Sequence, residues 1–543
     1  MANLAYEKDR NHFLRYLNAA AAGRSGRNEE IRTTPLFSLA VKHKVDQGMP
    51  EEEDDDDEEG EDTSDTSDTS DTSEDEDDET SSDNTNSLDS EQCSQSPPAP
   101  TCESTKTDQP VLLPQYGLLG FNVSDDDKIG EKEPIMLNTD APNSTFICGS
   151  QGSGKSYTLS CMLENLLLRG ADTGRVQNPV SGVVFHYDLD CASSIAEVAH
   201  LCSQGIEVNV LVSQSNERAL RQAYGKVGGR HGNLKVQPLL LRSADLSIER
   251  MNKLMALAEK EGPAPLYMEV VQRILRQMAI QGITKFDYKH FRRLLAGETL
   301  TRDQTAPMNL RFGLLESFMH PDDIPSATGA TGWHPATQQT NKLATGAKLF
   351  DLKPGSLTIV DLSDPFVDAS TVCILFDICL GLIKEQRPSG LVIALDEAHK
   401  FMNKSAAAAN FTDRLLTTIR EQRHNATRVI IATQEPTIDP KLLDLCSTTI
   451  VHRFSSPAWF DAIKGHLAGA SAMVADAEER NLMFERIVDL DVGESLVFCP
   501  SAFVNKDMSK LGAIAMKMKT RARLGEDGGM SLLASRFGEQ AKV

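Results

Sequence analysis

The sequence predicts an α/β protein with a mainly parallel β-sheet. Short, continuous apolar runs recur along the chain, and runs without alternation are typical of strands that helices cover on both faces. Several of these runs alternate with helical patterns, which favours parallel strands joined by helices. A glycine-rich loop also lies between one such run and the helical pattern that follows it. Together these three observations predict the α/β fold class.

The expected elements follow from these patterns in chain order. We predict strands over residues 145–148, 182–185, 208–212, 236–241, 356–360, 391–395, 429–433, 448–451 and 495–498. We predict helices over residues 157–169, 370–385 and 413–422. Near the C-terminus, residues 493–498 and 512–518 have the pattern of strands.

An acidic segment divides the chain. Residues 51–90 contain 22 Asp and Glu and no Lys or Arg, and such a composition cannot bury enough apolar surface to offset the entropy of the chain. We therefore predict residues 51–110 to be disordered, after an N-terminal arm over 1–50 with a short helix over 4–22. We expect one of two roles for this segment. It is a solubilising tail, or its Ser and Thr residues are phosphorylated and the segment binds a protein partner.

The remaining sequence has the composition of a folded domain. We predict one domain over residues 111–524 and a tail over 525–543. At about 246–320 apolar residues recur at helical spacing, which predicts a helical insertion, and residues 321–348 are rich in Gly, Thr, Ala and Pro, which predicts a surface loop. Because the chain outside the acidic segment is almost neutral, the net charge of −24 leaves a polyanionic partner open.

The cysteine and apolar patterns favour an intracellular protein outside the membrane. The ten cysteines form no CxxC pair, and Cys148, Cys161 and Cys373 lie in apolar runs, where a free thiol packs as a small hydrophobe. No apolar run reaches the roughly 18 residues of a membrane-spanning helix, and the N-terminus lacks the apolar region of a secretory signal. The nucleus and the cytoplasm both remain open.

The glycine-rich loop matches the phosphate-loop pattern GxxxxGK[ST] in full. Its residues are Gly149, Ser150, Gln151, Gly152, Ser153, Gly154, Lys155 and Ser156. Glycines let backbone NH groups curl around phosphate oxygens, and the N-terminus of the following helix adds the positive end of its dipole. We expect Lys155 to contact the β- and γ-phosphates of ATP, and Ser156 to hold Mg²⁺.

A second candidate element is the strand over residues 391–395, which ends in the acidic pair Asp396 and Glu397. In phosphoryl transfer one acid orients the metal ion and another activates the attacking water. We assign the first role to Asp396 and the second to Glu397. His399 follows the pair, but a histidine there can equally cap or pack locally, so we give it no catalytic role.

Polar residues near a third strand complete the candidate set. The strand over residues 429–433 ends in Gln434, which we expect near the γ-phosphate, where it senses the phosphate or positions water. Upstream, Arg420 and Arg423 lie at the end of a helix, a place where arginines often serve only the helix dipole. Arg453 is a further exposed candidate.

These elements resemble the HerA/FtsK branch of P-loop ATPases, the hexameric motors that pump DNA. The similar segments are GSQGSGKS, LVIALDEAHKF, REQR, RVIIATQEP and STTIVHRF, in this order over residues 135–498, about two thirds of the chain. The succession of LDEAH, REQR and ATQ is fairly specific to this branch. PIMLNTD before the phosphate loop and GSLTIVDLS before the acidic strand are similar too. We expect a eukaryotic member, with a fungal source as one option.

The resemblance implies a RecA-like fold and a ring-shaped assembly. The sheet would have the strand order 5-1-4-3-2, extended at its edge. ATP would bind at the subunit interfaces of a hexamer, with an arginine donated by the neighbouring subunit. In the family this arginine precedes the strand that ends in Gln, a place that Arg423 occupies here, with Arg420 as the second candidate. A donated arginine can raise the rate by about 10³ to 10⁵.

The chain departs from the family in two features. The resemblance therefore supports ATP hydrolysis as the reaction more strongly than it supports DNA as the cargo. Neither the β-barrel of HerA proteins nor the DNA-reading winged helix of FtsK proteins is evident. Two basic clusters could contact nucleic acid, although a solvated face is the commoner role of such clusters. They consist of Lys517, Lys519, Arg521 and Arg523 near the C-terminus, and of Lys285, Lys289, Arg292 and Arg293 in the insertion.

Other P-loop classes fit less well. A two-lobed helicase needs a second RecA-like lobe, and too few residues follow Gln434 for one. Transporter-type ATPases need an LSGGQ signature, which the sequence lacks, and AAA+ proteins have a helical lid where strands are expected here. Three functions remain: an ATP-driven nucleic-acid translocase, a motor that acts on protein, and a nucleotide-gated scaffold with slow turnover that recruits partners.

Overall fold

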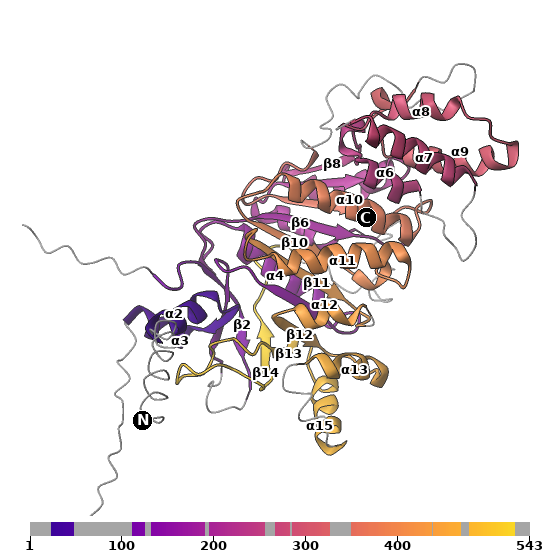
Figure 1. Ribbon diagram of the computed structural model, residues 1–543. Helices are drawn as coiled ribbons and strands as arrows, with labels where there is room; N and C mark the ends of the chain where they lie inside the picture. The colour runs from indigo at the N-terminus through magenta and orange to yellow at the C-terminus, as the bar shows by residue number, and fades with distance from the viewer. Residues whose placement is uncertain are drawn as a thin grey trace, which may run out of the picture. The chain divides into compact units, whose positions relative to one another are not determined.

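A single β-sheet with helices on both faces organises the described part of the chain (Figure 1). The computed structural model describes residues 23–47, 111–124, 132–189, 195–255, 266–282, 285–325, 349–436, 438–467 and 477–526. The described residues up to Asp46 and from Leu112 on belong to one compact unit. Several predicted segments lie wholly or mostly outside the described residues, namely 4–22, 51–110, 321–348 and 525–543.

One half of the sheet is parallel. In spatial order its strands are β12 (Thr448–His452), β4 (Ser144–Cys148), β11 (Thr427–Thr433), β10 (Leu391–Leu395), β6 (Ser181–His186), β9 (Leu357–Asp361), β7 (Val208–Val212) and β8 (Leu234–Pro238). The strands from β12 to β6 follow the predicted order 5-1-4-3-2, and the other three extend the sheet. Every residue of β4, β10 and β11 is buried, which explains their continuous apolar sequence.

Helices cover both faces of this half and build an apolar core on each. On one face lie α4 (Lys155–Leu167), η1 (Glu197–Gln204) and α5 (Glu217–Gly228). On the other lie α10 (Ala369–Glu385), α11 (Ala406–Arg420) and α12 (Pro440–Leu445) (Figure 1). None of the helices in the described ranges combines the length and the apolarity that crossing a bilayer requires.

The start of α11 differs from the prediction of a helix over 413–422. The helix begins about two turns earlier, at Ala406. The Ser405 side chain caps it by accepting a hydrogen bond from the Ala408 NH at 3.2 Å, and alanine has the highest helix propensity. A run of alanines has no apolar periodicity, so the pattern alone missed these turns.

The other half of the sheet is antiparallel, which corrects the prediction of a mainly parallel sheet. Beyond β12 it continues with β13 (Glu494–Phe498), β14 (Met516–Thr520), β2 (Tyr116–Asn122), β3 (Pro134–Asn138) and β1 (Leu36–Ser38), and β5 (Gly174–Arg175) pairs with β2. The described connection between β13 and β14 contains no helix that could cross the sheet. The chain therefore turns back, and the two strands pair antiparallel.

The described residues 23–47 of the predicted N-terminal arm belong to this antiparallel half. They form α2 (Gly23–Thr33), β1 and α3 (Leu39–Gln47). β1 pairs with β3 at the edge of the sheet because Leu36 and Phe37 bury their side chains there. Asn138 of β3 also donates its side-chain NH₂ to two carbonyls of this arm at 2.9 Å. Described residues before and after the acidic segment therefore belong to one sheet.

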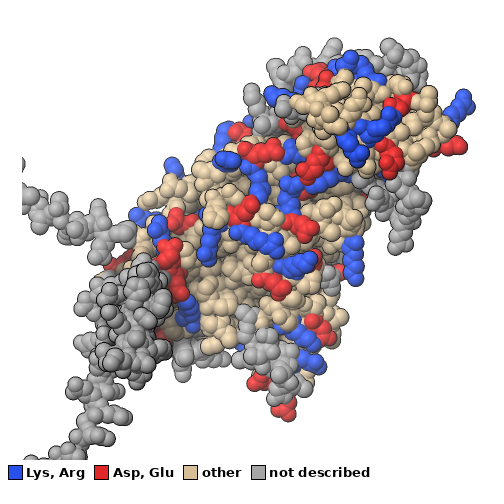
Figure 2. All heavy atoms as spheres, in the orientation of Figure 1, with Lys and Arg blue, Asp and Glu red and all other residues tan. Residues whose placement is uncertain are grey.

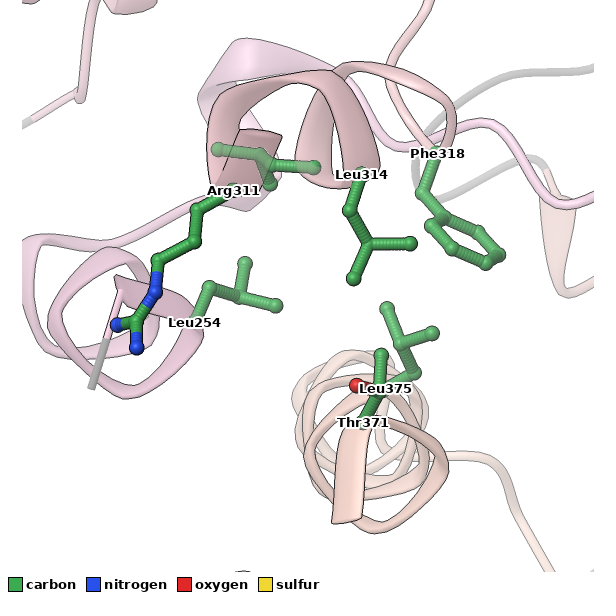
Figure 3. A pocket seen from close by; sticks show the side chains of 7 residues that line it. Leu254, Arg311, Leu314, Phe318, Thr371 and Leu375 are labelled. Carbon is green, nitrogen blue, oxygen red and sulfur yellow. The ribbon is translucent and has the colours of Figure 1, made fainter. Parts of the chain in front are cut away.

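The region predicted as a helical insertion lies between β8 and β9. Its helices are α6 (Ile248–Met255), α7 (Leu266–Ile280), α8 (Tyr288–Ala296) and α9 (Arg302–Glu316). α6 and α9 meet α10 around a small, mostly apolar hollow of about 40 Å³, lined in part by Leu254, Leu314 and Leu375 (Figure 3). The core on the α10 face of the sheet thus continues into the insertion.

The basic residues of the insertion do not form a surface of one sign. Arg292 lies over the Phe312 ring, 4.3 Å from its centroid. Lys285, Lys289 and Arg293 are exposed, and Figure 2 shows acidic side chains interspersed with basic ones over the insertion. Mixed charges produce little net field at a distance.

The C-terminal basic cluster is partly internal, which corrects the expectation that it faces solvent or phosphates. Arg521 pairs with Glu164 of α4 at 2.8 Å, and the two side chains are 3% and 0% exposed. Arg523 pairs with Glu197 of η1 at 2.6 Å and lies over the Tyr157 ring. These ion pairs fasten the chain after β14 to the helices on one face of the sheet.

Replacing Arg521 by methionine should lower the free energy of unfolding by about 3–5 kcal/mol, because the buried Glu164 carboxylate loses its counter-ion. Lys517→Met is the control, since the Lys517 and Glu494 side chains are 36% and 13% exposed, and it should cost about 1 kcal/mol or less. Urea unfolding measures both. Equal losses would show that the buried pair is worth no more than the exposed one.

The cysteines of the described part are free thiols. Burial raises the pKa of Cys148 and of Cys161 to about 12, so both stay protonated at neutral pH. A buried, protonated thiol is unreactive and fills space as an apolar group.

Candidate active site

The candidate residues meet at one edge of the sheet, where the parallel strands have their carboxyl ends. The phosphate loop joins β4 to α4, Asp396 and Glu397 follow β10, and Gln434 follows β11. β11 lies between β4 and β10 in the sheet. In open α/β sheets, ligands bind at this edge. The fold therefore unites elements that are far apart in the sequence.

The phosphate loop forms a turn that depends on glycine. Gly152 and Gly154 have φ angles of 72° and 113°, in the left-handed region that other residues seldom adopt. Lys155 begins α4, and its Nζ donates to the Ser150 carbonyl at 2.9 Å. Burial lowers the pKa of Lys155, whereas the charges of the acidic pair after β10 raise it. The amine thus lies within electrostatic reach of both carboxylates.

The loop is held in place by the end of β12. Ser150 donates to the Arg453 carbonyl from its backbone NH at 2.9 Å and from its Oγ at 2.8 Å. A Cβ added to Gly149 would lie 2.7 Å from the Cβ of His452, so only glycine fits between the loop and the strand. β12 therefore sets the position of the loop before any nucleotide binds.

His452, the last residue of β12, is completely buried beneath the loop. Its Nδ1 lies 2.9 Å from the Glu494 carbonyl oxygen, and its Nε2 lies 3.0 Å from Oγ1 of Thr158 in α4. Because a carbonyl only accepts, Nδ1–H donates and Nε2 accepts, which is the neutral tautomer. The sequence prediction missed this residue because its partners lie 42 and 294 positions away, and no local signal marks them.

Stability should fall in acid because of His452. Burial lowers its pKa from 6.5 to about 4, the Glu494 carbonyl opposes this, and the charge of Lys155 adds to it. Between these pH values the unfolded chain binds a proton that the folded chain does not, so lowering the pH favours unfolding, by up to about 3 kcal/mol. Between pH 7 and pH 4, urea unfolding should show a larger loss for the native chain than for His452→Gln, by up to about 3 kcal/mol. The same loss in both proteins would contradict the assignment.

Glu397 occupies a strained turn two residues after the end of β10. Its φ and ψ are 50° and 45°, a left-handed conformation that is uncommon for a residue with a side chain and costs energy. Gln434 Nε2 donates to Glu397 Oε1 at 2.9 Å. Glu397 Oε2 is buried and has no hydrogen-bond partner among the described residues. One oxygen thus orients the carboxylate, and the other is available to substrate or water.

His399 lies beside this acid as a neutral group. Burial lowers its pKa, although the charges of Glu397 and Glu435 raise it. Its Nδ1 is 3.4 Å from both the Gln434 backbone nitrogen and Glu397 Oε2. Since a backbone NH can only donate, Nδ1 accepts from Gln434 and gives no proton to the carboxylate. His399 therefore helps to position Gln434.

Asp396 is buried beside His186, the last residue of β6. Asp396 Oδ2 lies 3.3 Å from His186 Nδ1, and each side chain is 4% exposed. Burial by itself lowers the pKa of His186, but the contact with Asp396 and the charge of Asp361 outweigh it and raise the pKa to about 8. Asp396 Oδ1 is buried and has no hydrogen-bond partner in the described part of the chain. The sequence prediction did not identify His186.

The residues predicted to hold Mg²⁺ fit that ion. Ser156 is the second residue of α4 and follows Lys155 at the edge where Asp396 lies. Hydroxyl and carboxylate oxygens are ligands that Mg²⁺ prefers, together with water and substrate phosphates. The unpartnered Asp396 Oδ1 is a buried acceptor that a magnesium ion or its bound water would satisfy.

The candidate arginines lie at different edges of the sheet. α11 leads back from the carboxyl ends of the strands to the start of β11, so Arg420 and Arg423 lie at the opposite edge from the phosphate loop. β11 has 7 residues and is about 20 Å long, a distance that neither side chain can span. Arg420, Arg423 and Arg453 are all exposed, but Arg453 follows β12 next to the loop.

No protein-family model and no curated protein matches the chain, whereas several solved structures are similar to it. VirB4 of Thermoanaerobacter pseudethanolicus is 12% identical, with a TM-score of 0.42, over 76% of this chain and 97% of that chain. The genome packaging NTPase B204 from Sulfolobus turreted icosahedral virus 2, in complex with AMPPCP, is 9% identical, with a TM-score of 0.26, over 66% and 92%.

A third similar structure is EssC (ATPases 2 and 3) from Geobacillus thermodenitrificans. It is 13% identical, with a TM-score of 0.27, over 76% of this chain and 46% of that chain. Similarities at such low identities and TM-scores do not indicate the activity of this chain. The function of this chain must follow from its own site.

Proposed function

We propose that the chain is an ATPase that binds ATP at its phosphate loop and hydrolyses it with Glu397 as the general base. One observation carries this proposal. Glu397 follows a buried strand at the edge that holds the loop, with one oxygen fixed by Gln434 and the other without a hydrogen-bond partner in the described ranges. A loop that only bound nucleotide would need no such carboxylate.

ATP binding would rest on the loop and on α4. Backbone NH groups of residues 149–156 and the N-terminus of α4 would surround the phosphates. Lys155 would exchange its hydrogen bond to the Ser150 carbonyl for contacts with the β- and γ-phosphates. Mg²⁺, held through Ser156 and Asp396, would supply positive charge that offsets the charge of the phosphates.

Hydrolysis would depend on Glu397. Its carboxylate would accept a proton from a water molecule while the water oxygen attacks the γ-phosphorus. The bond from the γ-phosphorus to the bridging oxygen breaks, and ADP and inorganic phosphate are released. Gln434 would keep the carboxylate aligned through the hydrogen bond between its Nε2 and Glu397 Oε1.

We further propose that Arg423 of one subunit completes the site of the next, and that the resulting ring couples hydrolysis to movement along nucleic acid. The position of Arg423 supports the first part, since it is exposed at the edge opposite its own phosphate loop. A cation beside the transferred phosphoryl group stabilises the charge of the transition state. Nucleic acid as the cargo rests on the family resemblance.

The test is steady-state ATP hydrolysis with and without double-stranded DNA, with the molecular mass followed by light scattering. The native chain should form a ring and hydrolyse ATP faster with DNA. Lys155→Ala should lose nucleotide binding and turnover, whereas Lys404→Ala, which changes an exposed lysine before α11, should behave as the native chain does.

The other outcomes decide between the remaining functions. Slow hydrolysis that DNA does not change would favour a nucleotide-gated scaffold. Stimulation by polypeptide and not by DNA would favour a motor that acts on protein. No hydrolysis under any of these conditions would overturn the proposal of an ATPase.

A further inference from the structure

Three neighbouring strands end in polar side chains at the same level of the sheet. β6 pairs with β9 so that His186 lies opposite Asp361. β6 also pairs with β10 up to Phe185 and Leu395, which places Asp396, the next residue, beside His186. The Asp396 NH donates to the Phe185 carbonyl at 3.0 Å, which extends the pairing by one residue. The three side chains therefore form a row, with His186 in the middle.

The two oxygens of Asp396 have different surroundings. Oδ2 lies 3.3 Å from His186 Nδ1, and both side chains are 4% exposed. Oδ1 is buried and has no hydrogen-bond partner among the described residues. A carboxylate with one oxygen restrained cannot turn freely, so the direction of its other oxygen is set.

Among the described residues, the contact with Asp396 is the one ion pair of the His186 side chain. Asp361, on its other side, accepts hydrogen bonds from the Tyr224 hydroxyl at 2.6 Å and from the Ser363 NH at 3.0 Å. In the described part of the chain neither ring nitrogen of His186 makes a hydrogen bond of good geometry, so the contact of Nδ1 with Asp396 Oδ2 at 3.3 Å is an ion-pair contact. An unsatisfied buried polar atom costs about 1–3 kcal/mol, and the residues that precede His186 on β6 include Val183, Val184 and Phe185. For the free energy of folding alone, an apolar residue at position 186 would be more favourable than histidine.

We propose that His186 is a positioning residue, which holds Oδ2 of Asp396 so that Oδ1 faces the magnesium ion of the bound nucleotide. This inference rests on the proposed function, because it assigns Asp396 to the metal. Partners that orient a metal ligand commonly contribute 10–100-fold to metal affinity. The contribution of His186 should therefore appear in metal binding and not in the affinity for nucleotide without metal.

Two substitutions at position 186 distinguish a positioning role of the histidine from a role in packing alone. His186→Asn places a side-chain NH₂ close to the position of Nδ1, whereas His186→Gln places one close to the position of Nε2. Both residues are polar, uncharged amides, so both variants lose the imidazole, and only His186→Asn places an NH₂ group on the side of Asp396. His320→Gln is the matched control, because His320 is another buried histidine, 5% exposed, and lies far from Asp396 in the sequence, bonded to Arg242.

The measurement is the affinity of each protein for Mn²⁺ in the presence of a non-hydrolysable ATP analogue, followed by electron paramagnetic resonance. The affinity of the same analogue in EDTA is measured alongside, and thermal unfolding verifies that each variant folds. His186→Gln should weaken Mn²⁺ binding about tenfold, with His186→Asn and His320→Gln within about threefold of native. Analogue affinity in EDTA should be unchanged in all.

The outcomes distinguish this inference from the function on which it rests. If the native chain binds the analogue and Mn²⁺ but both His186 variants bind Mn²⁺ as it does, the positioning role is wrong and the ATPase proposal stands. Equal weakening by Asn and Gln would also overturn it, because the position of the donor would not matter. If the native chain binds no analogue, the proposed function fails, and this inference fails with it.

Discussion

Replacing Glu397 by glutamine should lower kcat by about 10²–10⁴, the usual contribution of a general base, while ATP still binds. The side chains have the same shape, so the contact between Gln434 and Oε1, at 2.9 Å, can form with the amide as it does with the carboxylate. What is lost is the capacity of the second oxygen to accept a proton. The binding site itself lies in the phosphate loop, which this substitution does not touch.

The measurement for Glu397→Gln combines single-turnover hydrolysis with the affinity for a fluorescent ATP analogue. Glu435→Gln is a suitable control, because Glu435 is exposed and follows Gln434 directly, and it should keep the native kcat. A Glu397→Gln protein that hydrolyses ATP within about threefold of the native rate would rule out a general base at this position.

Removing the Arg423 guanidinium by Arg423→Ala should lower turnover by about 10³ or more if the residue acts at a neighbouring site. The decisive experiment mixes this variant with Glu397→Gln, each of which is inactive alone. In an equal mixture about a quarter of the interfaces would join an intact Glu397 to an intact Arg423, so about a quarter of the native rate should return.

Two comparisons make the mixing experiment specific. Arg420→Ala, one turn earlier at the same edge, tests the second candidate, and the residue whose loss is rescued by mixing is the donated arginine. Arg230→Ala changes an exposed arginine after α5 and should leave turnover unchanged. Recovery of no activity in any mixture, with rings still formed, would exclude a site shared between subunits.

The parts of the site that could be predicted are those in which function depends on neighbouring residues. A phosphate loop needs glycines, a lysine and a helix N-terminus in one short stretch, so residues 149–156 were visible without any tertiary information. The acidic pair was visible for the same reason, because a continuous apolar strand precedes it. The prediction of the strand order 5-1-4-3-2 had a different basis, because it rested on the family resemblance and not on the residues themselves.

What could not be predicted depends on pairings between distant parts of the chain. The residues of β1 precede the acidic segment, and nothing in that short run reveals that it will pair with β3. His186 and His452 each end an apolar strand, a position that predicts neither Asp396 nor Thr158 as a partner. Arg521 was read as a surface cation because its charge is evident in the sequence, whereas the buried Glu164 that neutralises it lies in a different helix.

The placement of Glu397 and Arg423 at opposite edges of the sheet restricts the symmetry of any assembly in which they cooperate. A two-fold dimer would have to bring the Arg423 edge of each subunit beside the Glu397 edge of the other, an arrangement that completes two sites and ends the assembly at two subunits. If successive subunits instead meet head to tail, an open row always leaves one terminal site without its arginine. Closing the row into a ring removes that defect, and activity per subunit would then report whether the assembly has closed.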